Sequence, residues 1–83
     1  MSMKVALVTG GSSGIGEATA LKLNELGYTT YAAARRVERM DQLRSSGIRP
    51  IAMDVTDDDS MQSGIKHIVE EQERIDVLVN NAG

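Results

Sequence analysis

The stretch from Thr9 to Gly16, Thr-Gly-Gly-Ser-Ser-Gly-Ile-Gly, limits what this chain can fold into more than any other part of it. It follows the short apolar run of residues 5–8, which is typical of a strand buried on both faces of a parallel sheet. A strand that turns through glycines directly into a helix leaves unpaired N–H groups at the helix N-terminus, where the helix dipole also favours an anion. The sequence therefore predicts a turn that binds a pyrophosphate.

Each glycine of this turn has a separate physical role. Gly10 lets the chain leave the strand tightly, Gly14 lets the backbone approach the phosphates, and Gly16 lets the first helical turn lie close to the sheet. The hydroxyls of Ser12 and Ser13 could donate to phosphate oxygens. Serine is also an ordinary turn residue, so a purely conformational role for both serines stays open.

Two motifs carry a resemblance to a known family. The spacing Gly-x-x-x-Gly-x-Gly over residues 10–16 and the later run Asn-Asn-Ala-Gly over residues 80–83 both follow strand-like segments. In this order they resemble the short-chain dehydrogenase/reductase family. The resemblance covers the whole chain but only the N-terminal part of a family member. It implies that residues 1–83 are an NAD(P)-binding Rossmann domain, an N-terminal fragment that lacks the catalytic part.

Composition excludes several other classes of protein. The 83 residues suffice for one small domain, and the net charge of −3 is spread over both signs, which argues against a nucleic-acid surface. The absence of cysteine excludes disulfides, thiolate ligands and a cysteine nucleophile. No apolar run approaches the roughly 18 residues of a membrane span, and the start of the chain lacks the apolar region of a signal peptide. We expect a cytoplasmic protein that binds neither nucleic acid nor membrane.

Apolar periodicity and turn residues predict alternating strands and helices. Strands are expected at Lys4–Val8, Tyr28–Ala34, Arg49–Val55 and Ile75–Val79, and helices at Gly14–Leu26, at Val37–Ser46 and after Thr56 as N-cap. This βαβαβαβ order predicts an α/β fold, a partial Rossmann-type doubly wound parallel sheet with strand order 3-2-1-4. The fourth strand is then an edge, through which a product of only these residues would self-associate.

The helices are expected to be amphipathic. In the first helix the apolar side is expected to consist of Ile15, Thr19, Leu23 and Leu26, with the small Gly16 and Ala20 beside them. In the last helix it is expected to consist of Met61, Ile65, Ile68 and Val69. Gly64 should weaken the last helix by up to about 1 kcal/mol relative to alanine. Asp57 to Asp59 resemble a metal cluster, but successive helical side chains point in different directions, so they are expected to complement the helix dipole and no metal site is predicted.

The end of the second predicted strand indicates which dinucleotide binds. In dinucleotide folds an acidic residue there binds the ribose 2′-OH and selects NAD. Here the resemblance puts Ala34 at that place, followed by Arg35 and Arg36. Without a carboxylate at this place, a 2′-phosphate would not be repelled. A guanidinium, above all that of Arg35, would donate hydrogen bonds to it. We therefore expect NADP, with NAD less favoured; the alternative is that both arginines are solvated loop residues.

The resemblance implies further contacts with the cofactor. Asp54 would accept from the adenine amino group, and Val55 would contact the ring. The remaining members of the implied cofactor site are Ile15 in the glycine motif and Asn80, Ala82 and Gly83 after the fourth strand. The alternative for Asp54 is that it caps a turn, and asparagine and glycine are also common wherever a strand ends in a turn.

No catalytic residue is predicted within the chain. The family reduces carbonyls with a tyrosine, a lysine four residues later and a serine, and the resemblance places all of them beyond residue 83. Tyr31 and Arg35 have the same spacing, but on an extended strand they would lie about 13 Å apart.

Two functions from different classes follow. The first is the NADP-binding portion of an oxidoreductase that transfers a hydride between NADP(H) and a ketone or alcohol, expected to be a homo-oligomer. The second is a non-catalytic dinucleotide-binding or self-associating module, if the 83 residues are the whole product. Family relatives that epimerise or dehydrate are a less favoured third class, because their glycine spacing usually differs.

Overall fold

The computed structural model describes residues 4–10, 14–35, 37 and 40–80. Strands and helices alternate along these residues, as the sequence predicts. They are β1 (Val5–Thr9), α1 (Gly14–Glu25), β2 (Thr29–Ala34), α2 (Asp41–Ser45), β3 (Arg49–Ala52), α3 (Asp58–Gln72) and β4 (Val77–Asn80). None of the helices among these residues combines the length and the apolar character needed to cross a membrane.

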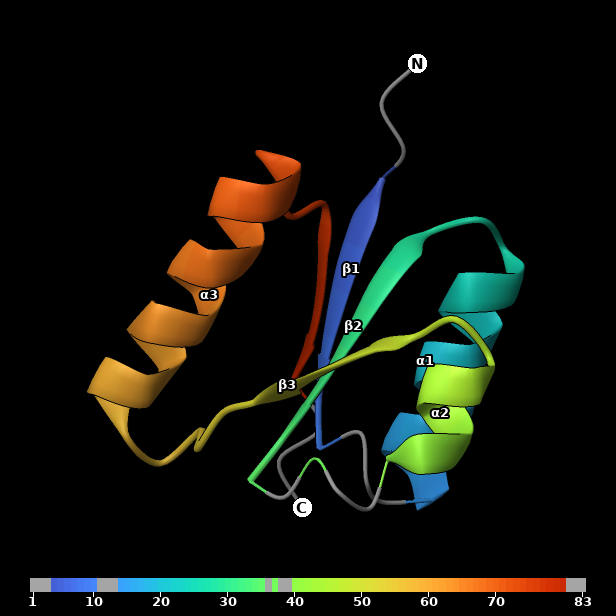
Figure 1. The fold of residues 1–83 in the computed structure, drawn as a ribbon, viewed down its shortest axis with the longest axis horizontal. Coiled ribbons are helices and arrows are strands. Elements are labelled where there is room, and N and C mark those ends of the chain that lie inside the picture. Colours follow the sequence, from blue (N-terminus) through green and yellow to red (C-terminus); the bar gives the residue numbers. More distant parts are fainter. Residues whose placement is uncertain (1–3, 11–13, 36, 38–39, 81–83) are drawn as a thin grey trace.

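The four strands form one parallel sheet in the order β3-β2-β1-β4, which confirms the predicted topology. β1 lies in the interior of the sheet, and its Val8 has Ala32 of β2 on one side and Val79 of β4 on the other. All five residues of β1 are buried, which explains the unbroken apolar run. Because the strands are parallel, their carboxyl ends lie at the same edge of the sheet (Figure 1).

The two faces of the sheet are covered by different helices. Figure 1 shows α1 and α2 on one side and α3 on the other. Successive residues of β1 serve the two faces in turn, so that Leu7 faces α3 and Val8 faces α1 and α2. The core under α1 and α2 consists of Val8, Ala20, Ala32, Ala34, Met40, Leu43 and Ile48. The core under α3 consists of Val5, Leu7, Tyr31, Ala33, Met53 and Ile68. This arrangement confirms the doubly wound fold.

The predicted inward faces of two helices are partly wrong. Leu26 is exposed and follows the end of α1 at Glu25. Ile15 is 74% exposed because α1 approaches the sheet through its buried small residues Gly16 and Ala20. Residues next to these in the sequence lie about 100° further round the helix and so miss the sheet. In α3 the same rotation leaves Ile68 fully buried and Val69 41% exposed.

The element boundaries differ from the prediction around residues 53–57. β3 ends at Ala52 instead of Val55, because the chain turns at Asp54, whose carboxylate accepts from the N–H of Thr56. The N-cap of α3 is Asp57, not Thr56. The Asp57 carboxylate accepts from the N–H groups of Asp59 and Ser60 at 3.0 and 3.4 Å, which satisfies N–H groups of the first turn.

The start of the second helix also differs from the prediction. α2 begins at Asp41 instead of Val37, so it is shorter than expected.

Gly64 of α3 is buried, and a Cβ atom added there would lie 2.2 Å from the Cε of Met53. Glycine has a low helix propensity, but here it lets α3 pack closely against Met53, the residue that follows β3. An alanine at position 64 would displace Met53.

One carboxylate ties the starts of β1 and β4 together. The N–H of Val5 donates to Oδ2 of Asp76 at 2.8 Å, and the N–H of Asp76 donates to the carbonyl of Val5 at the same distance. The guanidinium of Arg74 donates to the other carboxylate oxygen, through Nε at 3.0 Å. The Arg74 hydrogen bonds first, and then that of the Val5 N–H, lower the pKa of Asp76 below its ordinary value.

The lowered pKa of Asp76 predicts a pH-dependent contribution to stability. The folded protein binds this proton less tightly than the unfolded chain, so the contribution is complete above the unfolded pKa of about 4 and is lost as the pH falls through the folded value. We expect Asp76→Asn to be less stable than wild type at pH 7, with a difference that shrinks below about pH 4. Urea denaturation from pH 3 to pH 7 measures this difference. A difference that is constant over the whole range would contradict the assignment.

Candidate cofactor-binding site

The fold brings the predicted site residues to one edge of the sheet. Gly10, Arg35 and Asn80 stand at the carboxyl ends of β1, β2 and β4, and Asp54 and Val55 follow β3 (Figure 1). From β1 the chain proceeds first to β2 and β3 on one side and later to β4 on the other, so the order reverses between β1 and β4. In open α/β sheets ligands bind at the carboxyl end of such a switch point.

Some predicted residues are not covered by this description. Ser12, Ser13, Arg36, Ala82 and Gly83 lie outside the described residues. Their places in the sequence are next to the described parts of the same edge, and their roles remain predictions.

The described part of the glycine turn has the expected backbone conformation. Gly10 has φ +70°, in the left-handed region that glycine adopts readily. Helix α1 begins at Gly14, which is exposed, and Gly16 in its first turn is buried. The N–H groups of a first helical turn lack partners within the helix and attract anions.

Nothing in the described residues explains why position 14 is a glycine. Its φ is not positive, and an added Cβ atom would meet no described atom within 4 Å. Neither backbone strain nor packing against the described residues therefore excludes a side chain there. A side chain at Gly14 would point into space that no described atom occupies.

Thr9 connects the two strands at the switch point. Its side chain is buried, and its Oγ1 lies 3.1 Å from Oδ1 of Asn80 and 3.3 Å from the carbonyl oxygen of Val79. Asn80 is thus held by β1 in addition to standing in the predicted site. The sequence placed Thr9 at the start of the glycine turn but did not predict its contact with β4. The available signal was a threonine at the end of an otherwise apolar buried strand.

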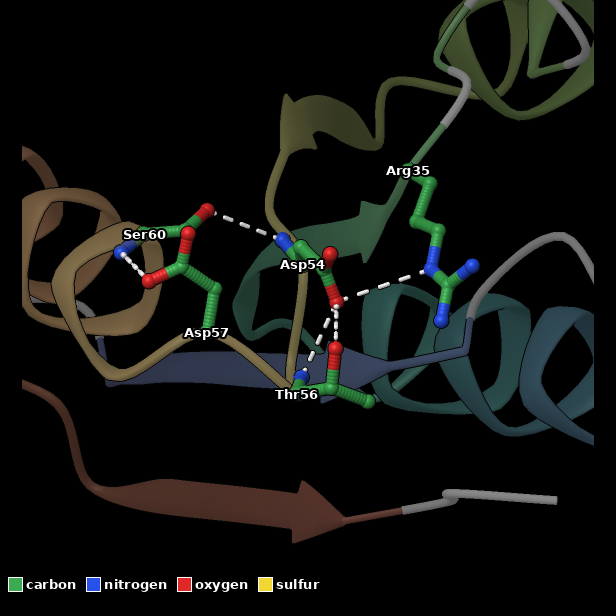
Figure 2. Close-up of polar contacts among 5 residues, drawn as sticks. All are labelled: Arg35, Asp54, Thr56, Asp57 and Ser60. Atoms are coloured by element: carbon green, nitrogen blue, oxygen red, sulfur yellow. Dashed lines mark hydrogen bonds and ion pairs between the residues drawn. The ribbon is translucent and has the colours of Figure 1, made fainter.

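Asp54 is the centre of a group of polar contacts between the ends of β2 and β3 (Figure 2). Its Oδ1 accepts from the N–H of Thr56 at 3.0 Å and from the Thr56 hydroxyl at 2.6 Å. The same oxygen lies 3.5 Å from Nε of Arg35, whose side chain is 70% exposed. The N–H of Asp54 donates to the hydroxyl of Ser60 at 2.9 Å, which fixes the turn to the first turn of α3.

These contacts keep Asp54 ionised. The Thr56 hydroxyl and then the Thr56 N–H are the main causes that lower the pKa of Asp54, and the charge of Arg35 adds a smaller effect in the same direction. Partial burial opposes them. Asp54 is therefore an acceptor at neutral pH. Its alternative interpretation as a turn-forming residue is confirmed, but its Oδ2 has no partner among the described residues and can still accept from a ligand.

Arg35 is largely exposed, and its guanidinium is paired with Asp54. Only its Nε takes part in that pair, and its two terminal nitrogens have no partner within the described part of the chain. An arginine presents its donors in a planar fork that matches phosphate oxygens. The arrangement can therefore hold an anion next to the end of β2.

Comparisons with known proteins agree with this geometry. A sequence profile described as short chain dehydrogenase matches residues 4–83. The NADPH-dependent 1-acyldihydroxyacetone phosphate reductase of Schizosaccharomyces pombe is 42% identical over 87 residues, which cover 96% of this chain and 28% of that protein.

Solved structures share the fold over the full chain. A short-chain dehydrogenase from Streptomyces avermitilis superposes with a TM-score of 0.94 at 41% identity, covering 100% of this chain and 32% of the other. A metagenomic short-chain oxidoreductase in complex with NADP gives 0.91 at 37% identity, covering 100% and 40%. The chain spans less than half the length of each of these proteins. By the profile match and these similarities, it belongs to the short-chain dehydrogenase/reductase family.

Proposed function

We propose that these residues form the NADP-binding part of an oxidoreductase that transfers a hydride between NADP(H) and a ketone or alcohol. The proposal rests mainly on Arg35, which follows β2 and whose terminal nitrogens are available for a ligand. Proteins of this fold that select NAD have a carboxylate at the end of this strand. Ala34 leaves no carboxylate there to repel a 2′-phosphate. The similar reductase described as NADPH-dependent and the similar structure in complex with NADP support this preference.

The chain's contribution to this function is to bind and orient the cofactor. NADP(H), when bound, supplies the hydride chemistry. Backbone N–H groups at the N-terminus of α1 would hold the pyrophosphate, with the glycine turn leaving room for it. The residues proposed for this part of the site are Gly10, Ser12, Ser13, Gly14, Ile15 and Gly16. The exposed Ile15 offers an apolar surface beside the turn.

The other end of the cofactor would lie over the ends of β2, β3 and β4. Arg35, with Arg36, would bind the 2′-phosphate, and the free Oδ2 of Asp54 would accept from the adenine amino group. Val55 is half-buried, and its N–H has no partner among the described residues, so it can donate to the ring. Asn80, Ala82 and Gly83 complete the proposed site.

Binding measurements with Arg35→Ala test the proposal. We expect the full-length protein to bind NADP more tightly than NAD. Loss of the guanidinium should weaken NADP binding by about tenfold, the effect of about one charge-assisted hydrogen bond, and should leave NAD binding nearly unchanged. Isothermal titration calorimetry with both nucleotides measures these affinities.

Arg44→Ala is the matched control, because Arg44 is also an exposed arginine but lies on α2 and pairs with Asp41. It should leave both affinities unchanged. A wild-type protein without preference for NADP, or an Arg35→Ala variant with an unchanged preference, would contradict the proposal.

One observation favours the second candidate, a self-associating module. β4 is an edge of the sheet, and its Leu78 is exposed on the face that α3 covers only in part. In a product of only these residues, that edge could pair with a second copy. Size-exclusion chromatography over a range of concentrations tests this, and a monomer at the highest concentration would contradict it. A homo-oligomeric state and a cytoplasmic location of the complete enzyme remain predictions from the sequence.

A further inference from the structure

Three side chains form a chain of contacts at the proposed 2′-phosphate end of the site. The Thr56 hydroxyl donates to Oδ1 of Asp54 at 2.6 Å, and the same oxygen pairs with Nε of Arg35 at 3.5 Å (Figure 2). Thr56 lies in the turn that follows β3, whereas Arg35 directly follows β2. A single carboxylate oxygen therefore links an exposed arginine in one loop to a threonine in another.

Arg35 needs such support because its side chain is long and 70% exposed. A free arginine side chain has about 2 kcal/mol of rotamer entropy to lose when it is fixed by a ligand. The ion pair with Asp54 restricts the guanidinium before a ligand arrives. Because the pair uses Nε, the two terminal nitrogens remain available for phosphate oxygens.

Asp54 needs support of its own. Its side chain is 39% exposed, so without a partner the carboxylate could rotate in solvent. The two donors of Thr56 meet at a single oxygen and fix the rotation of the carboxylate. The hydroxyl makes the shorter of the two hydrogen bonds and is the main cause of the lowered pKa of Asp54.

We propose that Thr56 is a positioning residue for the selectivity between NADP and NAD. It holds the Asp54 carboxylate, which in turn holds Arg35 with its terminal nitrogens directed to a 2′-phosphate, and Thr56 itself takes no part in the phosphate contact. This inference rests on the proposed function. It predicts that a residue remote from the phosphate contact changes the affinity for NADP relative to that for NAD.

Thr56 is a better residue to change than Asp54. Replacing Asp54 would remove the support of Arg35 and also remove a negative charge close to an anionic phosphate, and these effects have opposite signs. Thr56→Val keeps the shape of the side chain and changes no charge, and the backbone N–H stays in place. Thr56→Ser retains the hydroxyl. Thr56 is exposed, so neither change removes buried surface.

The experiment measures dissociation constants of NADP and NAD by isothermal titration calorimetry on the full-length protein. We expect Thr56→Val to lower the preference for NADP by about threefold to tenfold and Thr56→Ser to retain it. In an Arg35→Ala background, Thr56→Val should produce no further change in preference, because the residue through which it acts is gone. Thr56→Ala serves as a second hydroxyl-free variant, and circular dichroism confirms the folding of each.

Each result has a distinct meaning. If the wild type prefers NADP and the hydroxyl-free variants preserve that preference, the role of Thr56 is refuted while the proposed function stands. An equal loss of affinity for both nucleotides would show a merely structural role and also refute it. The role of Thr56 would also be refuted if Thr56→Val lowered the preference for NADP equally in the wild-type and Arg35→Ala backgrounds. A wild type without preference for NADP would refute the proposed function, and this inference with it.

Discussion

A Gly14→Ala variant should be as stable as the wild type and should bind NADP about a hundredfold more weakly. The added methyl group meets no described atom within 4 Å, and the backbone of Gly14 is not in the left-handed region. Alanine is also favoured over glycine within a helix. The methyl group would instead occupy the space proposed for the pyrophosphate. Loss of two charge-assisted hydrogen bonds at about 1.5 kcal/mol each amounts to about 3 kcal/mol, which corresponds to about a hundredfold.

Gly27→Ala is the matched control at the other end of α1. An added Cβ atom there also meets no described atom within 4 Å, but Gly27 has φ +98°. The left-handed conformation costs a residue with a side chain about 1–2 kcal/mol. This variant should therefore lose stability by about that amount and keep its affinity for NADP. The two substitutions are the same in chemistry and opposite in expected effect.

Urea denaturation and calorimetric titration with NADP measure the two effects separately. Unchanged NADP affinity in Gly14→Ala would show that the phosphates do not approach α1 at this residue. A loss of stability in Gly14→Ala as large as that in Gly27→Ala would show instead that Gly14 is required by the fold.

The topology could be predicted from the sequence because it depends on local patterns. The buried run of β1, the glycine turn and the alternation of strands with helices together select a parallel sheet with right-handed crossovers. The rotation of the helices could not be predicted in the same way. The glycine motif predicted that the first turn of α1 lies close to the sheet at Gly16, and Gly16 is buried with Ala20. The periodicity of the large apolar residues instead placed Ile15 and Val69 on the inward faces, and both are exposed.

The sequence could predict where in the fold the candidate site lies. In a parallel sheet the residues that follow the strands meet at one edge, so the gathering of Arg35, Asp54 and Asn80 required only the strand order. The contact between Arg35 and Asp54 was not predictable, because it joins side chains of two loops and depends on their rotamers. For the same reason Thr56 was expected to cap α3, whereas Asp57 does so and Thr56 turns to Asp54.

Ile68→Ala should destabilise the protein by about 2–5 kcal/mol, the usual cost of truncating a large buried aliphatic side chain. Ile68 is 0% exposed and belongs to the core between α3 and the sheet, with Leu7 and Met53 among its members. Val69→Ala is the control in the neighbouring position. Because Val69 is 41% exposed, its truncation should change stability by no more than about 0.5 kcal/mol. Urea denaturation of both variants measures the difference, and equal losses would mean that α3 is rotated relative to the sheet.

The same pair separates stability from binding. Ile68 lies in the core between α3 and the sheet, whereas α1, whose N-terminus is proposed to hold the pyrophosphate, lies on the other face of the sheet (Figure 1). A saturating ligand that binds only the folded state stabilises it by an amount set by its concentration and dissociation constant. NADP should therefore raise the unfolding free energy of wild type, Ile68→Ala and Val69→Ala by the same amount. A smaller increase for Ile68→Ala alone would show that packing under α3 supports the cofactor site, for example through the Asp54 turn that Ser60 of α3 holds.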